Sequence, residues 1–165
     1  MNKKRYIANK EWFQSHRKAQ NMLRFLYKAL PLIMVAVVPV MIIVKAFMGI
    51  DRDFLRLIFV PLVVLAAVTI MRKIINKSRP YEVYDTEPVI NRDGKGESFP
   101  SRHTASAFII AMCAIPVSVP LAVVLLIISV MIGLTRIFAG VHFISDVIMG
   151  ALISVLTGLV FFVIL

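Results

Sequence analysis

Long apolar runs alternate with shorter polar segments over most of the chain, and the first 28 residues stand apart from this pattern. A helix that crosses the hydrocarbon of a bilayer needs about 20 predominantly apolar residues. We therefore predict an all-α fold, a multi-spanning transmembrane helix bundle with about five spans. The runs are Leu30–Ile50, Phe54–Ile75, Ser101–Ser118, Leu121–Thr135 and Val141–Leu165.

The third and fourth runs are shorter than a usual span, so their ends should lie slightly inside the apolar slab, where a sunken polar site could form. Lys77–Phe99 is the one long polar loop, and its Pro and Gly residues favour turns. Ser101 follows Pro100 and is placed to cap the third helix.

Residues 1–28 mix many Lys and Arg residues with Trp, Phe, Met, Leu and Tyr. This composition predicts a basic amphipathic helix that lies in the membrane interface, and the alternative is a disordered basic tail. We treat residues 1–28 as one unit and residues 29–165 as a transmembrane domain. The polar start of the chain does not resemble a cleavable signal peptide.

Composition agrees with a membrane environment. Hydrophobic residues make up 59% of the chain, whereas a soluble domain has about 45–50%. The formal net charge is +10, which suits nucleic acid, anionic lipid or a phosphorylated substrate. The apolar bulk argues against nucleic acid and leaves membrane lipids as the surroundings. The single cysteine, Cys113, excludes an internal disulfide.

If all five runs span, they alternate in direction, and three polar segments share one face of the membrane: the N-terminal segment, the loop Lys77–Phe99 and the break Arg136–Gly140. Ionisable side chains in or beside spans are costly and therefore indicate function. Those at the run ends on this face are Arg72, Arg79, Arg102, His103, Arg136, His142 and Asp146.

This set of side chains suits phosphate chemistry. Arg guanidinium groups bind phosphate oxygens as forks, and backbone N–H groups at a helix start add donors. Two His supply a nucleophile and an acid near neutral pH. His142 and Asp146 are four residues apart, so on one helix they would share a face, and the carboxylate could orient the imidazole. Taken singly, each residue could instead be an interfacial anchor, a loop charge, a helix cap or a structural pair.

The residues resemble the three motifs of the type 2 phosphatidic acid phosphatase superfamily. The first motif is Lys, six residues, then Arg-Pro, and here Arg72 begins the stretch that ends in Arg79-Pro80. The second is Pro-Ser-Gly-His, and here it reads Pro100-Ser101-Arg102-His103. The third is Ser-Arg, five residues, His, three residues, Asp, and here Thr135-Arg136, His142 and Asp146 fit it.

The resemblance implies that the transmembrane domain is a metal-independent lipid phosphatase with no cofactor. It implies that His142 attacks phosphorus, Asp146 orients His142, and His103 protonates the leaving oxygen. It also implies a phosphate cradle, which consists of Arg72, Arg79, Ser101, Arg136 and the main chain at Arg102. The expected reaction is hydrolysis of a lipid phosphate or diphosphate through a phosphohistidine intermediate.

The substrate remains open among isoprenoid diphosphates, phosphatidic acid and phosphatidylglycerophosphate, and so does the oligomeric state. Arg102 stands where the motif has Gly, so a Cβ could crowd the phosphate. Alternatively, the Arg side chain could add another contact to the phosphate or bind a second phosphate. A catalytically silent lipid-phosphate-binding homologue is therefore the alternative. A small transporter or channel subunit is a third reading, but charges gathered on one face rather than at the midplane speak against it.

Charge also predicts the orientation of the protein in the cell membrane. Sixteen of the 19 Lys and Arg residues lie on the expected active-site face. Without the four catalytic candidates Arg72, Arg79, Arg102 and Arg136, the ratio is still 12 to 3. Short loops with such an excess normally remain in the cytoplasm, so we expect a multi-pass protein whose active site opens to the cytoplasm.

Overall fold

The structure, a computed structural model, describes residues 2–91 and 94–164, and all regular elements within these ranges are helical. The predicted all-α class is confirmed. The elements are α1 (Lys3–Ser15), α2 (Arg17–Met48), α3 (Arg52–Ile75), α4 (Pro80–Val83), α5 (Arg102–Cys113), α6 (Val119–Phe138), α7 (Ile144–Leu159) and the π-helical turn η1 (Val160–Ile164).

Among the residues that the structure describes, four helical segments are long and apolar enough to cross a membrane: α2, α3, α6, and α7 with its continuation to Phe162. The third predicted span is shorter than expected. α5 has 12 residues and is about 18 Å long, because it ends at Cys113 and gives way to turns before α6. It packs against α3, α6 and α7 and contributes much of the buried apolar core. The predicted five spans thus become four candidate spans around a short inner helix.

The outward faces of the long helices are strongly apolar. Leu32 on α2, Phe47 on α2 and Ile70 on α3 are 68%, 90% and 57% exposed. Large contiguous apolar surfaces are rare on soluble monomers, so these faces are suited to contact lipid. This surface and the four long apolar helices together define a membrane protein.

Two span boundaries differ from the prediction. α6 extends from Val119 to Phe138 and is therefore a full-length helix, because the Ser118 side chain caps its start and Thr135–Arg136 remain helical. α7 begins only at Ile144, so the first residues of the fifth predicted run form a loop. His142 therefore lies in this loop. The expected arrangement, in which His142 and Asp146 share one face of a helix, is not present.

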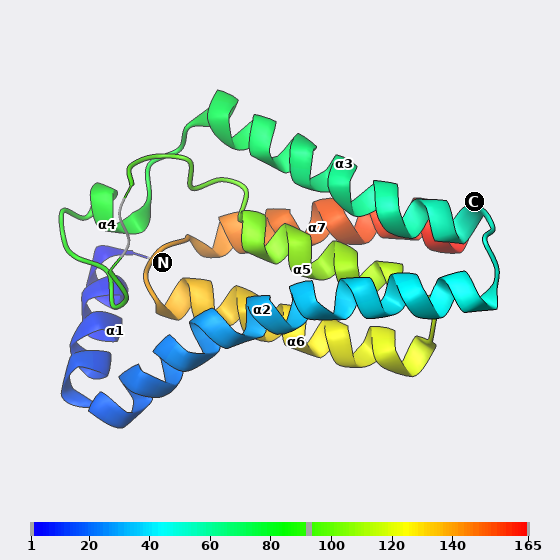
Figure 1. Cartoon of the computed structure of the whole chain (residues 1–165). Coiled ribbons are helices and arrows are strands. Elements are labelled where there is room, and N and C mark those ends of the chain that lie inside the picture. The colour runs from blue at the N-terminus through cyan, green and yellow to red at the C-terminus, as the bar shows by residue number, and fades with distance from the viewer. Residues whose placement is uncertain (1, 92–93, 165) are drawn as a thin grey trace.

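The N-terminal segment forms two helices rather than a tail. α1 ends at Ser15, the chain bends at His16, and α2 then continues from Arg17 through residue 28 into its apolar part. The predicted division between residues 28 and 29 consequently falls inside one continuous helix. α1 lies across one end of the bundle, transverse to the long helices (Figure 1).

The polar segments gather at the end of the bundle where α1 lies. α4, the loop that follows it and the connection between α6 and α7 are all at this end, whereas the connections after α2 and α5 and the C-terminal end of α7 lie at the other (Figure 1). The end that carries α1 is called the polar end below. It contains the residues that the sequence analysis singled out.

Candidate active site

His142 and Asp146 form the centre of the polar end. Both side chains are buried, and His142 Nδ1 lies 3.7 Å from Asp146 Oδ2. This separation is longer than a hydrogen bond, and Nδ1 has no other hydrogen-bond partner among the residues that the structure describes. Catalytic hydrogen bonds are often long without substrate and shorten in the reactive complex. Because Nδ1 faces the carboxylate, Nε2 is the nitrogen available for chemistry.

Asp146 is fixed by two side chains that the sequence analysis did not single out. Ser98 Oγ donates a hydrogen bond to Asp146 Oδ2 at 2.6 Å, and Lys77 Nζ contacts Oδ1 at 2.7 Å. The backbone N–H of Phe143 also donates to Oδ2, at 3.0 Å. Lys77 lies within the six-residue spacer of the first motif and Ser98 lies two residues before Pro100. Their positions carry no chemical signature, so only their nearness to the motifs could have indicated them.

Arg72 and Arg79 are both buried at the polar end. Arg72, at the end of α3, donates to the Pro100 carbonyl at 2.9 Å. Arg79 donates through its guanidinium to the carbonyls of Gly96, Glu97 and Val141. These bonds join the first motif to the second and third motifs. They also place Arg79 beside the loop that carries His142.

The start of α5 brings the second motif to the same place. Ser101 is the N-cap residue, as predicted, but its side chain makes no capping hydrogen bond. Its Oγ instead accepts from Thr104 Oγ1 at 2.9 Å, and its backbone N–H donates to the Asp146 carbonyl at 2.8 Å. His103 is partly exposed and Arg102 is exposed. Arg102 thus differs from the buried Arg72, Arg79 and Arg136.

Arg136 is buried near the end of α6 and contacts α2. Its guanidinium stacks on the Tyr27 ring, 3.7 Å from the ring centroid, and donates to the Tyr27 carbonyl at 3.1 Å. A guanidinium over an aromatic face is an attractive arrangement. The contact with α2 was not expected, because the sequence placed residues 1–28 in a separate unit.

Burial, with a smaller contribution from the nearby Arg79 guanidinium, lowers the pKa of His142 to about 4 against the opposing effect of Asp146. A lowered pKa keeps the imidazole neutral at physiological pH, and a neutral imidazole has a lone pair for nucleophilic attack. The surrounding guanidinium groups favour a bound anion. The electrostatics therefore suit a neutral nucleophile beside a negatively charged substrate.

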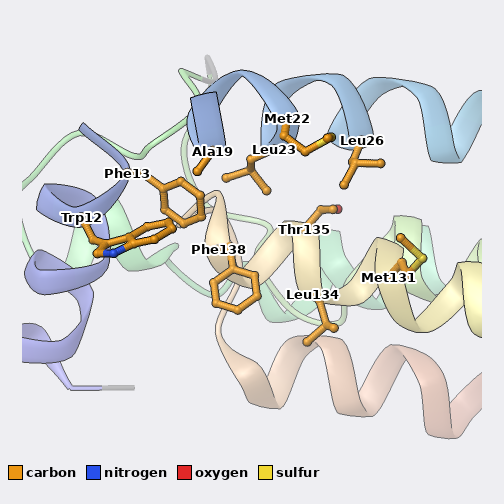
Figure 2. A pocket seen from close by; sticks show the side chains of 10 residues that line it. All are labelled: Trp12, Phe13, Ala19, Met22, Leu23, Leu26, Met131, Leu134, Thr135 and Phe138. Carbon is orange, nitrogen blue, oxygen red and sulfur yellow. The ribbon is translucent and has the colours of Figure 1, made fainter. Parts of the chain in front are cut away.

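The described residues contain no group of three or more His, Cys, Asp or Glu side chains that could hold a metal ion. A pocket of about 310 Å³ lies between α1, α2 and α6, beside the polar end. Figure 2 shows Phe13, Leu23 and Phe138 around it, and none of its lining residues is ionisable. This pocket is therefore apolar and distinct from the polar cluster.

The fold and this cluster define a class of protein: a helical membrane protein with a buried, arginine-rich histidine site at one end. Comparison with known proteins identifies the family. The PAP2 superfamily model matches residues 53–165, which is more than half of the chain. The chain belongs to the PAP2 superfamily, and the resemblance seen in the sequence is confirmed.

The LpxE structure agrees with this assignment. LpxE from Aquifex aeolicus has 26% sequence identity and a TM-score of 0.61, and the match covers 85% of this chain and 92% of that chain. A transmembrane PAP2-type phosphatidylglycerolphosphate phosphatase from Bacillus subtilis has 20% identity and a TM-score of 0.49, with 92% and 90% covered. No curated protein matches the chain. Family and fold indicate a membrane phosphatase and support lipid phosphate hydrolysis.

Proposed function

We propose that the chain hydrolyses a membrane lipid phosphate or diphosphate through a phosphohistidine formed on His142. The observation that carries this proposal is the burial of His142 against Asp146 at 3.7 Å, beside the guanidinium of Arg79, which donates to the adjacent Val141 carbonyl. Burial and the nearby cations disfavour protonation of the imidazole, so it keeps the lone pair that attacks an anionic group.

In the first step, His142 Nε2 attacks phosphorus while the bond from phosphorus to the leaving oxygen breaks. His103, at the start of α5, gives its proton to that oxygen, so the leaving group departs as a neutral lipid alcohol or as a lipid monophosphate protonated on that oxygen. Asp146 stabilises the positive charge that develops on the imidazole. Arg72, Arg79, Arg136 and the main chain at Arg102 hold the phosphoryl oxygens.

In the second step, water attacks phosphorus and the bond between phosphorus and Nε2 breaks. His103, now neutral, accepts the proton of the water, which restores the starting protonation states and releases inorganic phosphate. The two steps together need no metal ion or cofactor.

The second candidate function is a silent homologue that binds a lipid phosphate without hydrolysing it. Arg102 favours this alternative, because the motif has Gly where this chain has a Cβ and a long side chain. The exposed position of Arg102 weakens the alternative, since its side chain is not buried among Arg72, Arg79 and His142.

A panel assay on the purified protein in detergent tests the proposal. Isoprenoid diphosphate, phosphatidic acid and phosphatidylglycerophosphate are supplied separately, and free phosphate is measured with and without EDTA. We expect turnover of at least one lipid that is unaffected by EDTA and abolished in His142→Ala. Activity of His142→Ala within tenfold of wild type would exclude His142 as the nucleophile, and phosphate release from none of the lipids would favour the silent homologue.

The role of His103 is tested through the leaving group. A lipid alkoxide is a poor leaving group, whereas a nitrophenolate or a phosphate needs little protonation. His103→Ala should therefore lose more activity on a phosphate monoester than on an activated aryl phosphate or a diphosphate. Equal losses on all three substrates would contradict an acid role.

A further inference from the structure

The family match begins at residue 53, so α1 and α2 lie outside it. Both helices nevertheless contact the segment 136–142, which carries Arg136 and His142. This segment, called the nucleophile loop below, includes the end of α6 and the loop before α7. α1 contacts the residues just before His142, and α2 contacts Arg136.

The first contact is made by Tyr6 on α1. The Tyr6 side chain is 1% exposed, and its hydroxyl donates to the Gly140 carbonyl at 3.1 Å, two residues before His142. Asn9 Nδ2 donates to the neighbouring Phe138 carbonyl at 2.9 Å. The Tyr6 ring also packs on Tyr84, with 5.3 Å between centroids. α1 therefore holds two carbonyls of the nucleophile loop.

Gly140 is shaped for this contact. Its φ of +77° is a left-handed conformation, and a Cβ at this position would lie 2.7 Å from the Tyr6 hydroxyl. Only glycine accepts both conditions without strain. The left-handed conformation of Gly140 and the position of the Tyr6 side chain therefore depend on each other.

The second contact is made by Tyr27 on α2. Its ring lies 3.7 Å from Arg136 and its carbonyl accepts from the same guanidinium. An apolar cluster that joins α1, α2 and the nucleophile loop packs against Tyr27. It consists of Phe13, Leu23, Val89, Ile90, Ala139 and Val141. Phe13 and Phe138 lie close to each other at the junction of α1 and α6 (Figure 2).

We propose that the N-terminal helices are a part of the active site, in which Tyr6 positions the backbone that presents His142 and Tyr27 positions the guanidinium of Arg136. The inference rests on the proposed functions of His142 and Arg136. The two tyrosines should have different kinetic signatures. Tyr6 acts on the nucleophile and should affect kcat, whereas Tyr27 acts on a phosphate ligand and should affect phosphate affinity.

The experiment uses the full-length protein and four variants: Tyr6→Phe, Tyr27→Leu, Tyr27→Phe and Gln14→Ala. Tyr6→Phe removes only the hydroxyl, and Tyr27→Phe keeps the ring that stacks on Arg136. Gln14 is exposed on α1 and serves as the matched control. We measure kcat, KM, inhibition by inorganic phosphate, and hydrogen–deuterium exchange of residues 138–143 by mass spectrometry.

Tyr6→Phe should lower kcat about fivefold with little change in KM. A loss of about fivefold is the effect expected when one neutral hydrogen bond is removed. It should also speed amide exchange in residues 138–143. Tyr27→Leu should raise the inhibition constant for inorganic phosphate about fivefold. Tyr27→Phe should stay within about twofold of wild type, because it retains the ring that stacks on Arg136. Gln14→Ala should also stay within about twofold, because it leaves the Tyr6 contact unchanged.

Unchanged exchange and kcat in Tyr6→Phe would overturn the role of Tyr6. Equal phosphate inhibition in Tyr27→Leu and Tyr27→Phe would overturn the role of Tyr27. A wild-type protein that hydrolyses no lipid phosphate would instead overturn the proposed function, and hydrogen–deuterium exchange of residues 138–143 would still decide whether Tyr6 holds the nucleophile loop.

Discussion

At the scale of single residues, Arg102 is the main departure from the family motif, and its exposure leads to a prediction. Arg102→Gly should keep or raise activity on a monophosphate, because it restores close approach of the backbone to the phosphate. If the Arg side chain binds a second phosphate, the same change should selectively weaken hydrolysis of a diphosphate. The measurement is kcat/KM on a matched pair of mono- and diphosphate lipids.

A large loss on both substrates would show that Arg102 is a primary phosphate ligand. Arg79→Lys is a useful companion variant, because it retains charge but cannot reproduce the three carbonyl contacts of the buried guanidinium. We expect Arg79→Lys to lose activity on both substrates where Arg102→Gly does not.

His142 predicts a pH dependence. Its pKa is lowered from 6.5 to about 4 by burial, so the neutral nucleophile should persist well below pH 6. The acid limb of kcat/KM should accordingly have its midpoint near pH 4, measured with a soluble activated aryl phosphate. A midpoint near 6.5 would mean that the imidazole is solvated in the working enzyme.

The same pKa shift affects stability with a definite sign. Between pH 6.5 and about 4 the unfolded state binds a proton at His142 that the folded state does not bind. Stability therefore falls as pH falls through this window, and His142 contributes nothing to the pH dependence above it. The slope should be smaller in His142→Gln, which has no imidazole to protonate.

At the scale of elements, the close packing of α5 on α7 positions the second motif against the third. A Cβ on Gly150 would lie 2.7 Å from the Ser101 carbonyl oxygen, a backbone atom that cannot move easily. Gly150→Ala should push the helices apart where the Ser101 N–H bonds to the Asp146 carbonyl. We expect a destabilisation of about 1–3 kcal/mol and a loss of activity.

Thermal unfolding in detergent and phosphate release measure the two effects of Gly150→Ala. Leu152→Ala on the same helix is the control, because Leu152 is 47% exposed on the outer surface. An active and fully stable Gly150→Ala protein would show that the contact between α5 and α7 is adaptable.

Sequence reasoning predicted the elements well where hydrophobic length decides the structure and less well where local contacts do. The second span was predicted as Phe54–Ile75, and α3 covers Arg52–Ile75. α6 is longer than the predicted run because capping at Ser118 and helical geometry through Arg136 do not depend on hydrophobicity. His142 was expected on a helix, but α7 begins two residues later.

The motifs brought His142, Asp146 and the arginines into view because their residue types and spacing suit phosphate chemistry. Ser98, Lys77, Tyr6 and Tyr27 could not be found in this way. Each is an ordinary residue type, and its role comes from a long-range contact that a single sequence does not display. Tyr6 is the clearest example. In the sequence it is a tyrosine in a basic segment, which suggests an interfacial aromatic residue, and only the fold shows that it is buried and donates to the Gly140 carbonyl.

At the scale of the whole molecule, positive charge is concentrated at the polar end, where α1 and the nucleophile loop lie. Short loops rich in Lys and Arg normally remain in the cytoplasm, so we predict that the polar end faces the cytoplasm. The test introduces a cysteine at Lys95, an exposed residue at the polar end, in a Cys113→Ala background. Intact cells are then treated with a membrane-impermeant maleimide.

Labelling of Lys95→Cys only after lysis is the expected result. Ile50→Cys is the matched control, because Ile50 is 76% exposed in the connection between α2 and α3 at the opposite end of the bundle. It should label in intact cells. The reverse pattern would place the active site outside the cytoplasm.

The hydrogen bond between Tyr6 and Gly140 joins residues 134 positions apart, and this distance sets an order of events during synthesis. α1 leaves the ribosome before the carbonyls that it will bind, because Gly140 follows Tyr6 by 134 residues and Phe138 follows Asn9 by 129. A nascent chain that stops before Gly140 lacks His142 and also lacks the surface on which α1 docks. α1 can therefore reach its final position only after synthesis has passed Gly140. Catalysis of the proposed kind reaches its full rate only once α1 has met the loop that carries His142.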